Sequence, residues 1–573
     1  MKTKRKYLNN IIVLVILTLL PLVSPDPVIA IAFMAIVYAM FATGLNIIVG
    51  WTGLLDLGAA GFVAVGAYSA AIMLTQFHLP PLLVILLNLP IGFVFGVLLG
   101  LPTLRHREDY FAILTMGFAE LVALTIRNWP AVTKGSYGYS NIPPTILPFS
   151  TQPLSAVPPI GFYYLALLTI ILLYYLVRKL RETMIGRYFQ QIKENETIAS
   201  LFGINVIKTK IIAFGTSAAI ISLGGFFWAS YQRSVVWTEF GILLSCLFIA
   251  FIVIGGIGNP LGVIIGAAVI GSLQEVLRNI LTEFGLPTNI RFLIFSTILI
   301  LFILIRPKGI LQDKPEWFNS IKLGKLNKVK NKSRQKLKNS EILIEIKNLV
   351  KRFGGLVALN NLSFSIRAGE TLAIIGPNGS GKTTLLNLLN GLVKRDKGEI
   401  LYNGKQIHNL SIHKISRLGI GRTLQEISVI NDLSIIDNVL LVNDNIDFKV
   451  VEDSFRNAGI INLKENVDRL SYGEKKKLDV LRMLNKKEFW DVILLDEPTA
   501  GLTQTESLQL VQYLRKLKEE IGFTLVIVSH DVLFLESLGL DRVIVLNKGK
   551  MFKEGSYSSI RNDKEVQKIF WGI

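Results

Sequence analysis

Ten apolar runs within the first 306 residues constrain the fold more than any other feature. Each is close to the roughly 20 residues that a helix needs to cross about 30 Å of hydrocarbon. A single run is compatible with a buried core helix, but ten in succession are typical of a polytopic all-α membrane domain. The predicted spans are residues 8–25, 27–49, 54–76, 82–102, 109–126, 161–178, 210–230, 241–257, 260–279 and 290–306.

The basic residues between these runs predict how the chain is oriented. Lys and Arg concentrate in cytoplasmic loops, and four of them lie before the first run, at Lys2, Lys4, Arg5 and Lys6. Counting spans from a cytoplasmic N-terminus places the remaining clusters inside. They are Arg105, Arg107, Arg178, Lys179, Arg181, Arg187, Lys193, Lys208, Lys210, Arg306 and Lys308, whereas the outer loops carry only Arg127, Lys134 and Arg233. We expect a multi-pass protein of the cytoplasmic (inner) membrane with both termini in the cytoplasm. Residues 1–25 also match the pattern of a signal peptide.

A basic segment follows the last run. Eight Lys or Arg and no acidic residue lie between Lys322 and Lys338, and they supply eight of the nineteen net positive charges. Next to a membrane span, such charges either attract anionic lipid or keep a tether solvated. The lipid bilayer is therefore the expected partner, and no nucleic acid is needed to explain the net charge.

From residue 341 onward the pattern is that of an α/β domain. Short β-branched runs alternate with helical patterns, which indicates a parallel sheet. The predicted strands are Ile342–Ile346, Thr371–Ile375, Val492–Leu495, Thr524–Val528 and Arg542–Leu546. The predicted domains are a membrane domain over 1–306, a linker over 307–340 and an α/β domain over 341–573.

A glycine-rich loop after the second of these strands predicts a phosphate site. The loop opens a helix predicted over Leu385–Leu392, and its backbone N–H groups and the helix N-terminus are placed to bind phosphate. In this pattern Lys382 reaches the β- and γ-phosphates and the Thr383 hydroxyl binds Mg²⁺. The loop consists of Gly376, Pro377, Asn378, Gly379, Ser380, Gly381, Lys382, Thr383 and Thr384.

Several polar residues elsewhere fit the same site. Asp496 and Glu497 end the strand Val492–Leu495, where a carboxylate can bind Mg²⁺ and another can polarise an attacking water. Ser471 is placed as the N-cap of a helix. Gln425 precedes these residues in the chain, and His530 follows the predicted strand Thr524–Val528.

Taken together, residues 341–573 resemble the P-loop nucleotide-binding domain of ABC transporters. The resemblance implies ATP and Mg²⁺, with catalytic roles for Glu497, His530 and Gln425. It implies that Thr383, Asp496 and Gln425 bind the metal, and that Phe353 stacks on adenine. Ser471, Gly473 and Glu474 correspond to the signature motif, which in this family contacts the ATP of a second, head-to-tail domain.

The sequence departs from the family pattern in three places. The signature reads Leu-Ser-Tyr-Gly-Glu, and Thr503 stands in Ala500–Thr503 where an Asp is usual. The segment 426–469 is shorter than the usual helical subdomain, which leaves less surface for docking on a membrane domain.

The membrane half resembles the permeases of branched-chain amino-acid ABC importers. The matching stretches are Gly44–Gly58, Gly61–Tyr68, Asp109–Glu120, Thr133–Gly138, Ile185–Asn205 and Val253–Gly262. Their dense Gly and Ala between 58 and 67 predict close helix packing.

Other residues of the membrane half are candidates for function. Polar groups at membrane depth usually face a protein interior or an aqueous path, so Asn46, Asp56 and Glu120 are candidates for the substrate path. Met184–Asn205 is predicted as one amphipathic helix, and it resembles the coupling helix that docks on the ATPase. An interfacial membrane helix is the alternative.

These observations predict a fused permease and ATPase that imports branched-chain or related amino acids. The resemblance implies an extracytoplasmic substrate-binding protein, together with a second permease and a second ATPase supplied by different chains rather than by a homodimer. Three alternatives stay open at this point. They are an importer of urea or short amides, an exporter, which the ten spans with short inner loops disfavour, and a membrane-anchored ATPase that does not import.

Overall fold

The structure is a computed structural model of the chain. It describes residues 17–104, 108–143, 160–285, 287, 290–312, 341–431, 433–441, 448–457, 459–460, 462–484 and 490–568. Residues 8–16 of the predicted span 8–25 lie outside these residues, whereas 17–23 are described and helical. The basic segment Lys322–Lys338 lies wholly outside them. The chain forms two compact units, one of Met1–Lys193 with Ile207–Lys314, and one of Glu194–Val206 with Pro315–Ile573.

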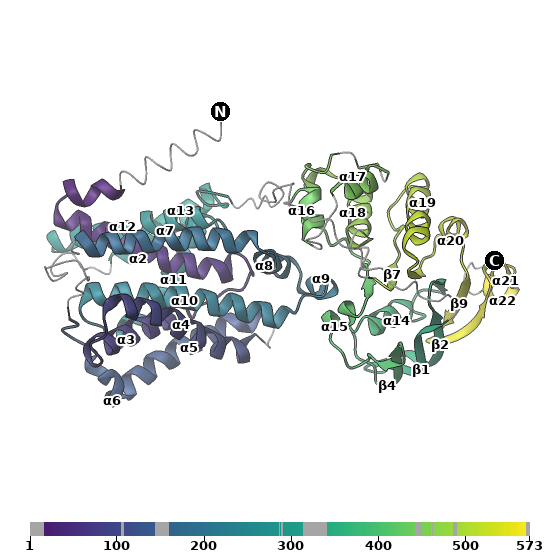
Figure 1. The fold of residues 1–573 in the computed structure, drawn as a ribbon, viewed down its shortest axis with the longest axis horizontal. Helices are drawn as coiled ribbons and strands as arrows, with labels where there is room; N and C mark the ends of the chain where they lie inside the picture. The colour runs from purple at the N-terminus through teal and green to yellow at the C-terminus, as the bar shows by residue number, and fades with distance from the viewer. Residues whose placement is uncertain are drawn as a thin grey trace. The chain divides into compact units, whose positions relative to one another are not determined.

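The first unit consists of helices (Figure 1). Their order is α2 (Asp26–Val49), α3 (Ala59–Thr75), α4 (Pro81–Thr103), α5 (Glu108–Asn128), α6 (Pro130–Thr133), α7 (Ile160–Glu182), α8 (Met184–Glu194), α10 (Val206–Gln232), α11 (Ile242–Gly255), α12 (Pro260–Glu283) and α13 (Ile290–Ile305). Short 3₁₀ segments, η1 (Gly135–Tyr137) and η2 (Trp237–Phe240), follow α6 and α10.

Nine of these helices overlap the predicted spans from 27–49 to 290–306. Six of them, α2, α4, α5, α7, α10 and α12, are long and apolar enough to cross a membrane, and α3, α11 and α13 are shorter. The prediction for 54–76 began too early, because α3 starts only at Ala59 and Asp56 lies in the preceding loop. The prediction for 241–257 was also too long, since α11 covers 14 residues.

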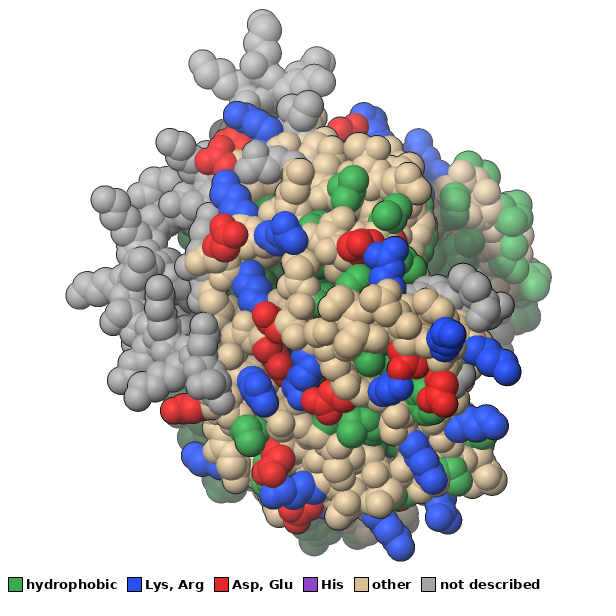
Figure 2. All heavy atoms as spheres, turned by 90° about the vertical axis from the view of Figure 1, so that its right-hand side faces the viewer, with side chains coloured by type: hydrophobic (Ala, Val, Ile, Leu, Met, Phe, Trp, Pro, Cys, Tyr) green, Lys and Arg blue, Asp and Glu red, His purple; other side chains and the backbone are tan. Residues whose placement is uncertain are grey.

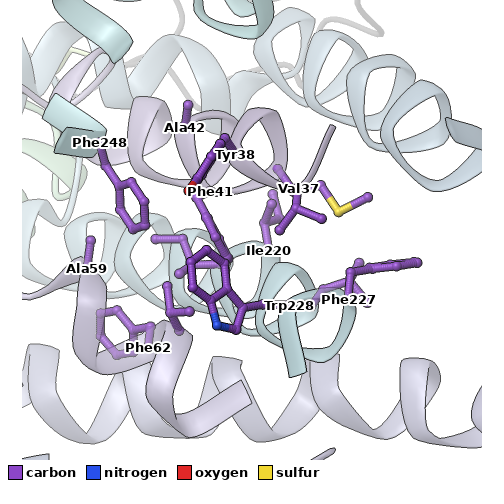
Figure 3. Packing of buried hydrophobic residues seen from close by; sticks show 14 of the residues in the cluster. Val37, Tyr38, Phe41, Ala42, Ala59, Phe62, Ile220, Phe227, Trp228 and Phe248 are labelled. Atoms are coloured by element: carbon purple, nitrogen blue, oxygen red, sulfur yellow. The ribbon is translucent and has the colours of Figure 1, made fainter. Parts of the chain in front are cut away.

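Aromatic side chains fill the centre of this unit. Figure 3 shows Tyr38 and Phe41 of α2 close to Trp228 of α10 and Phe248 of α11. The Phe41 and Phe248 rings are 4.9 Å apart, and those of Tyr38 and Trp228 are 6.0 Å apart. All of these side chains are buried, and aromatic pairs at such distances add to the stabilisation from burial.

Small residues let α3 and α4 approach α10. A Cβ at Gly66 would clash with the Ser222 carbonyl, and a Cβ at Gly96 would lie 2.7 Å from that of Ala218. Both glycines therefore serve helix packing, as the sequence predicted for Gly66 but not for Gly96.

The second unit contains two sheets. One has the order β10-β9-β3-β8-β7-β6, with β3 (Thr371–Ile375), β6 (Ile420–Arg422), β7 (Val492–Asp496), β8 (Thr524–Val528), β9 (Arg542–Asn547) and β10 (Lys550–Gly555). All neighbours in it are parallel except β9 and β10.

The other sheet is antiparallel, with the order β2-β1-β4-β5. It consists of β1 (Ile342–Phe353), β2 (Leu356–Arg367), β4 (Lys397–Tyr402) and β5 (Lys405–Gln406). The five predicted strands exist, but the assignment of Ile342–Ile346 to the parallel sheet was wrong. That run pairs with β2 as a long hairpin, and the turn at Gly354–Gly355 was not identified in the sequence.

Helices complete the second unit. They are α9 (Glu196–Leu201), α14 (Lys382–Leu389), α15 (Ile412–Arg417), α16 (Ile435–Leu440), α17 (Phe448–Asn457), α18 (Tyr472–Leu484), α19 (Gln504–Ile521), α20 (Val532–Leu538), α21 (Tyr557–Arg561) and α22 (Lys564–Val566), with a 3₁₀ segment at η4 (Val467–Arg469). The face of this unit that Figure 2 shows carries basic and acidic side chains intermixed, as on a water-exposed domain.

Two predicted helices have different bounds in the structure. The helix after the glycine-rich loop begins at Lys382 rather than Leu385 and ends at Leu389. The single helix predicted over Met184–Asn205 is two helices, α8 and α9, because Asn195 has an extended backbone and caps α9 by accepting from the Ile198 N–H.

Candidate nucleotide and coupling site

The glycine-rich loop is held in its curled shape by glycine conformations. Gly376, Gly379 and Gly381 have φ values of +152°, +77° and +103°. A Cβ at Gly376 would clash with the Leu546 carbonyl of β9, and one at Gly381 would lie 2.6 Å from the Ala358 carbonyl. The loop between β3 and α14 therefore has the compact backbone that lets N–H groups converge on a phosphate.

Lys382 opens α14 and points back over this loop. Its Nζ donates to the carbonyl oxygens of Gly376 at 2.8 Å and Pro377 at 2.9 Å. Burial lowers the pKa of Lys382, while Glu497 and Asp496 nearby act in the opposite direction. The ammonium group is thus held close to the loop and to both carboxylates.

Asp496 ends the buried strand β7 and pairs with Arg422 of β6. The Arg422 Nη2 to Asp496 Oδ2 distance is 2.9 Å, and the two side chains are only 2% and 1% exposed. Arg422 also donates to Asn387 of α14 at 2.5 Å. Burial raises the pKa of Asp496 and Arg422 opposes this shift. Among the described residues, Asp496 Oδ1 is buried without a hydrogen-bond partner.

Glu497 and His530 face each other. His530 Nε2 lies 3.4 Å from Glu497 Oε1, and the Glu497 N–H donates to the Val528 carbonyl at 2.8 Å. Glu497 has φ +47°, a left-handed conformation that is rare for a non-glycine residue and common at functional sites. Burial and nearby Lys382 lower the pKa of His530, and Glu497 acts against this.

The signature residues form the start of α18. The Glu474 N–H donates to Ser471 Oγ at 3.3 Å, and the Ser471 N–H donates to Glu474 Oε2 at 2.9 Å. This reciprocal pattern is a capping box and confirms Ser471 as the N-cap. Within the described part of the chain, no hydrogen bond or ion pair is recorded between Ser471–Glu474 and the loop Gly376–Thr384.

Gln425 has an exposed side chain, but its backbone is fixed by α18. Lys476, which is buried, donates from Nζ to the carbonyl oxygens of Leu424 at 3.3 Å and Gln425 at 2.7 Å. Two turns later on the same helix, Arg482 pairs with Asp479. The segment after β6 is therefore attached to the signature helix by buried charges.

Ser428 joins that buried ion pair. Its hydroxyl donates to Asp479 Oδ1 at 2.5 Å and accepts from Arg482 Nη2, which also donates to the Ser428 carbonyl at 2.8 Å. The Arg482–Asp479 distance is 2.8 Å, with the side chains 2% and 3% exposed. We call Ser428, Asp479 and Arg482 the Asp479 cluster.

The segment Glu194–Val206 packs on this region of the second unit. Ser416 Oγ donates to the Leu201 carbonyl at 2.6 Å, and Arg417 Nε donates to the Gly203 carbonyl at 2.8 Å. The Arg482 guanidinium lies 5.3 Å from the centre of the Phe202 ring, a cation–π distance. A cavity of about 10 Å³ is lined by residues that include Phe202, Ser428 and Asp479.

Phe353 ends β1 with its ring 48% exposed. The Lys351 Nζ lies 5.2 Å from the ring centre. An exposed aromatic face at a strand end is suited to stack on a flat base.

The three polar candidates of the membrane half differ in burial and in hydrogen bonding. Asn46 is buried, and its Oδ1 accepts from the Gly258 N–H at 2.9 Å. Asp56 is buried, and its Oδ1 accepts from the Gly58 N–H at 2.7 Å. Both brace backbone inside the unit, whereas Glu120 is exposed on α5.

Several buried charged residues around this candidate site were not anticipated from the sequence. Arg422, Lys476 and the Asp479 cluster were not identified as functional. An available signal was the Asp479–Arg482 spacing of three within the apolar stretch Leu478–Leu484, since charges there must pair in order to be buried.

Known protein families match segments in both units. Residues 28–304 match a family described as "Branched-chain amino acid transport system / permease component". Residues 359–500 match a family described as "ABC transporter".

Individual relatives correspond to one part of the chain each. LivG of Salmonella typhimurium, a high-affinity branched-chain amino acid transport ATP-binding protein, is 30% identical over 256 residues, 41% of this chain and 99% of LivG. BraF of Pseudomonas aeruginosa, with the same description, is 29% identical over 255 residues, 41% of this chain and 99% of BraF. LivM of Salmonella typhimurium, a permease protein of such a system, is 32% identical over 302 residues, 49% of this chain and 69% of LivM.

Proposed function

The chain belongs to the ABC transporters of the branched-chain amino acid type, with permease and ATP-binding components fused, and we propose that it imports branched-chain or related amino acids using ATP. One observation carries the proposal. The permease match at 28–304 and the ATPase-type match at 359–500 lie on one chain, and the relatives of both parts come from one kind of transport system.

ATP hydrolysis follows from the residues around the glycine-rich loop. Loop N–H groups and Lys382 bind the phosphates, and the Glu497 carboxylate accepts a proton from the attacking water. His530, 3.4 Å from Glu497, orients that carboxylate. Phe353 supports the adenine by stacking.

The residues present also fit a Mg²⁺ ion. Asp496 Oδ1 is buried and lacks a partner among the described residues, and the exposed Thr383 hydroxyl lies at the start of α14. These two groups, with the Gln425 side chain, would hold the ion, which supplies positive charge to the phosphate oxygens when bound. Arg422 keeps the Asp496 carboxylate in position.

A second ATPase completes each nucleotide site. The start of α18 offers Ser471, Gly473 and free helix N–H groups to a phosphate, and no recorded contact within the described chain joins them to its own phosphate loop. Following the family resemblance, we propose that they contact the ATP of a partner ATPase. A second permease and an extracytoplasmic substrate-binding protein complete the assembly, with different partner chains favoured over a homodimer.

Coupling runs through Glu194–Val206. This segment joins α8 to α10, and it contacts α15 and the Asp479 cluster. Lys476 holds the Gln425 backbone next to that cluster. Movement of Gln425 as ATP binds is thereby transmitted to the chain entering α10. The N-terminus and the ATPase would both lie in the cytoplasm.

The test is reconstitution of the full chain with its partner subunits in liposomes. We expect a binding protein loaded with a branched-chain amino acid to stimulate ATP hydrolysis and drive uptake. Glu497→Gln should bind ATP and abolish uptake, which serves as the control for catalysis. Uptake of urea or a short amide in place of amino acids would refute the cargo assignment. If the ATPase rate is the same with and without the loaded binding protein, import is refuted.

A further inference from the structure

Glu120 occupies an unusual place on α5. It lies within the apolar stretch Tyr110–Asn128, which is long enough to cross a membrane. At 1.5 Å per residue it is about 15 Å from Tyr110 and about 12 Å from Asn128, so it sits close to the middle of the hydrocarbon layer. Its side chain is exposed on the surface of the unit.

Neither lipid nor the described part of the chain offers this carboxylate a suitable neighbour. No hydrogen bond or ion pair of Glu120 is recorded among the described residues, in contrast to Asn46 and Asp56. An acidic side chain at the centre of a bilayer costs about 2.5–3.5 kcal/mol by insertion measurements. This face of α5 must therefore border water, a ligand or another protein in the working transporter.

Gly117 lies beside Glu120 on the same face and is exposed. A Cβ at Gly117 would meet no atom within 4 Å, whereas one at Gly61 on α3 would lie 3.1 Å from the Ala119 Cα. Packing within the unit thus does not explain this glycine. Residues three apart on a helix are neighbours, so the open space beside Gly117 adjoins the carboxylate.

The remaining residues on this face are apolar. Ile113 and Leu124 lie at helical spacing from Glu120, and Met116 borders Gly117. All three side chains are exposed in the unit. We call Ile113, Met116, Gly117, Glu120 and Leu124 the Glu120 face. It combines one negative charge, a position without a side chain and an apolar border, which is complementary to an ammonium group attached to a small aliphatic side chain.

We propose that Glu120 binds the ammonium group of the amino acid in transit, and that the open space beside Gly117 leaves room for its side chain. This rests on the proposed function and deepens it by naming a substrate-contacting residue. Arg127 lies two turns further along the same face, about 10 Å away. That is too far to hold the carboxylate of the same α-amino acid, so another element of the assembly binds the carboxylate.

The experiment compares variants of the full chain, assembled with its partner subunits in liposomes that contain ATP. Glu120→Gln should raise the KM of amino-acid uptake at least tenfold while leaving the basal ATPase rate within twofold, and Glu120→Asp should restore part of the affinity. Gly117→Leu should impair uptake of leucine more than that of alanine. Glu275→Gln is the matched control, because this acid on α12 already pairs with Arg278 at 2.9 Å; its uptake should stay within twofold of wild type.

Two results would overturn the proposal. One is an unchanged KM in Glu120→Gln. The other is loss of the partner permease from purified Glu120→Gln, which would mean that Glu120 pairs with a basic residue of that subunit. The wild-type chain measured in the same vesicles tests the proposed function separately, since absence of amino-acid uptake there would refute import before any variant is compared.

Discussion

The Asp479 cluster should be a strong determinant of stability in the second unit. Asp479→Leu leaves Arg482 buried and charged with no carboxylate. Burial already lowers the pKa of Arg482, and Asp479 is the group that opposes this shift. Removing one member of a buried ion pair costs about 3–5 kcal/mol.

The expected loss of stability can be compared with that of an exposed ion pair in the same unit. Arg456 and Glu452 on α17 form an ion pair at 3.1 Å, but their side chains are 62% and 39% exposed. Exposed pairs of this kind contribute about 0.3–0.5 kcal/mol. For a domain of this size, 1 kcal/mol shifts Tm by about 2–4 °C. We therefore expect Asp479→Leu to lower the midpoint by about 6–20 °C, and Glu452→Ala to lower it by no more than about 2 °C.

The assay is the thermal unfolding midpoint of the purified full chain, followed by circular dichroism. A double variant, Asp479→Leu with Arg482→Met, completes the cycle. Replacing a buried pair with apolar residues is often neutral, so the double variant should recover most of the loss. If the two single losses simply add in the double variant, the two residues do not act as a pair. If Asp479→Leu matches Glu452→Ala, the burial argument fails.

Three further predictions concern the loop, the coupling segment and pH. Gly376→Ala should abolish ATP binding, measured with a fluorescent nucleotide, because its Cβ would clash with a β9 carbonyl; Gly379→Ala, which meets no atom within 4 Å, should weaken binding far less, and equal effects would contradict this. Phe202→Ala should keep basal ATPase activity but lose stimulation by the loaded binding protein, and retained stimulation would count against the coupling path. Because the pKa of His530 is lowered, the unfolded state binds more protons just below the ordinary histidine pKa of about 6.5. Its contribution to stability is complete above that pH and is lost as pH falls. Thermal unfolding midpoints, followed by circular dichroism, should therefore fall more steeply below pH 6.5 in wild type than in His530→Gln, and parallel curves would contradict the lowered pKa of His530.

Local patterns carried most of the prediction for the ATP site. The phosphate loop and the cap at Ser471 depend on hydrogen bonds within a few residues of sequence, so residue types at fixed spacing indicate them. The break between α8 and α9 was equally local. Asn195, a favourable N-cap residue, stood in the predicted helix, and the amphipathic pattern across it outweighed that signal.

Contacts between distant segments could not be predicted in this way. Arg422 and Asp496 are 74 residues apart, and Lys476 is 51 residues from Gln425. Each lies beside its partner only because β6 pairs with β7 and α18 packs over the following loop. The antiparallel position of β1 is another such case, since a β-branched run does not specify its partner strand.

The membrane half shows why residue type alone does not assign a role. In the sequence, Asn46, Asp56 and Glu120 are equivalent polar groups at membrane depth. In the fold, the oxygens of the first two face N–H groups of Gly258 and Gly58, so they stabilise loops at helix ends. Glu120 faces outward from a span that contains no second acidic residue between Tyr110 and Asn128. An unpaired charge at that depth is costly, and the described part of the unit records no partner for Glu120, which is why we assign it a ligand.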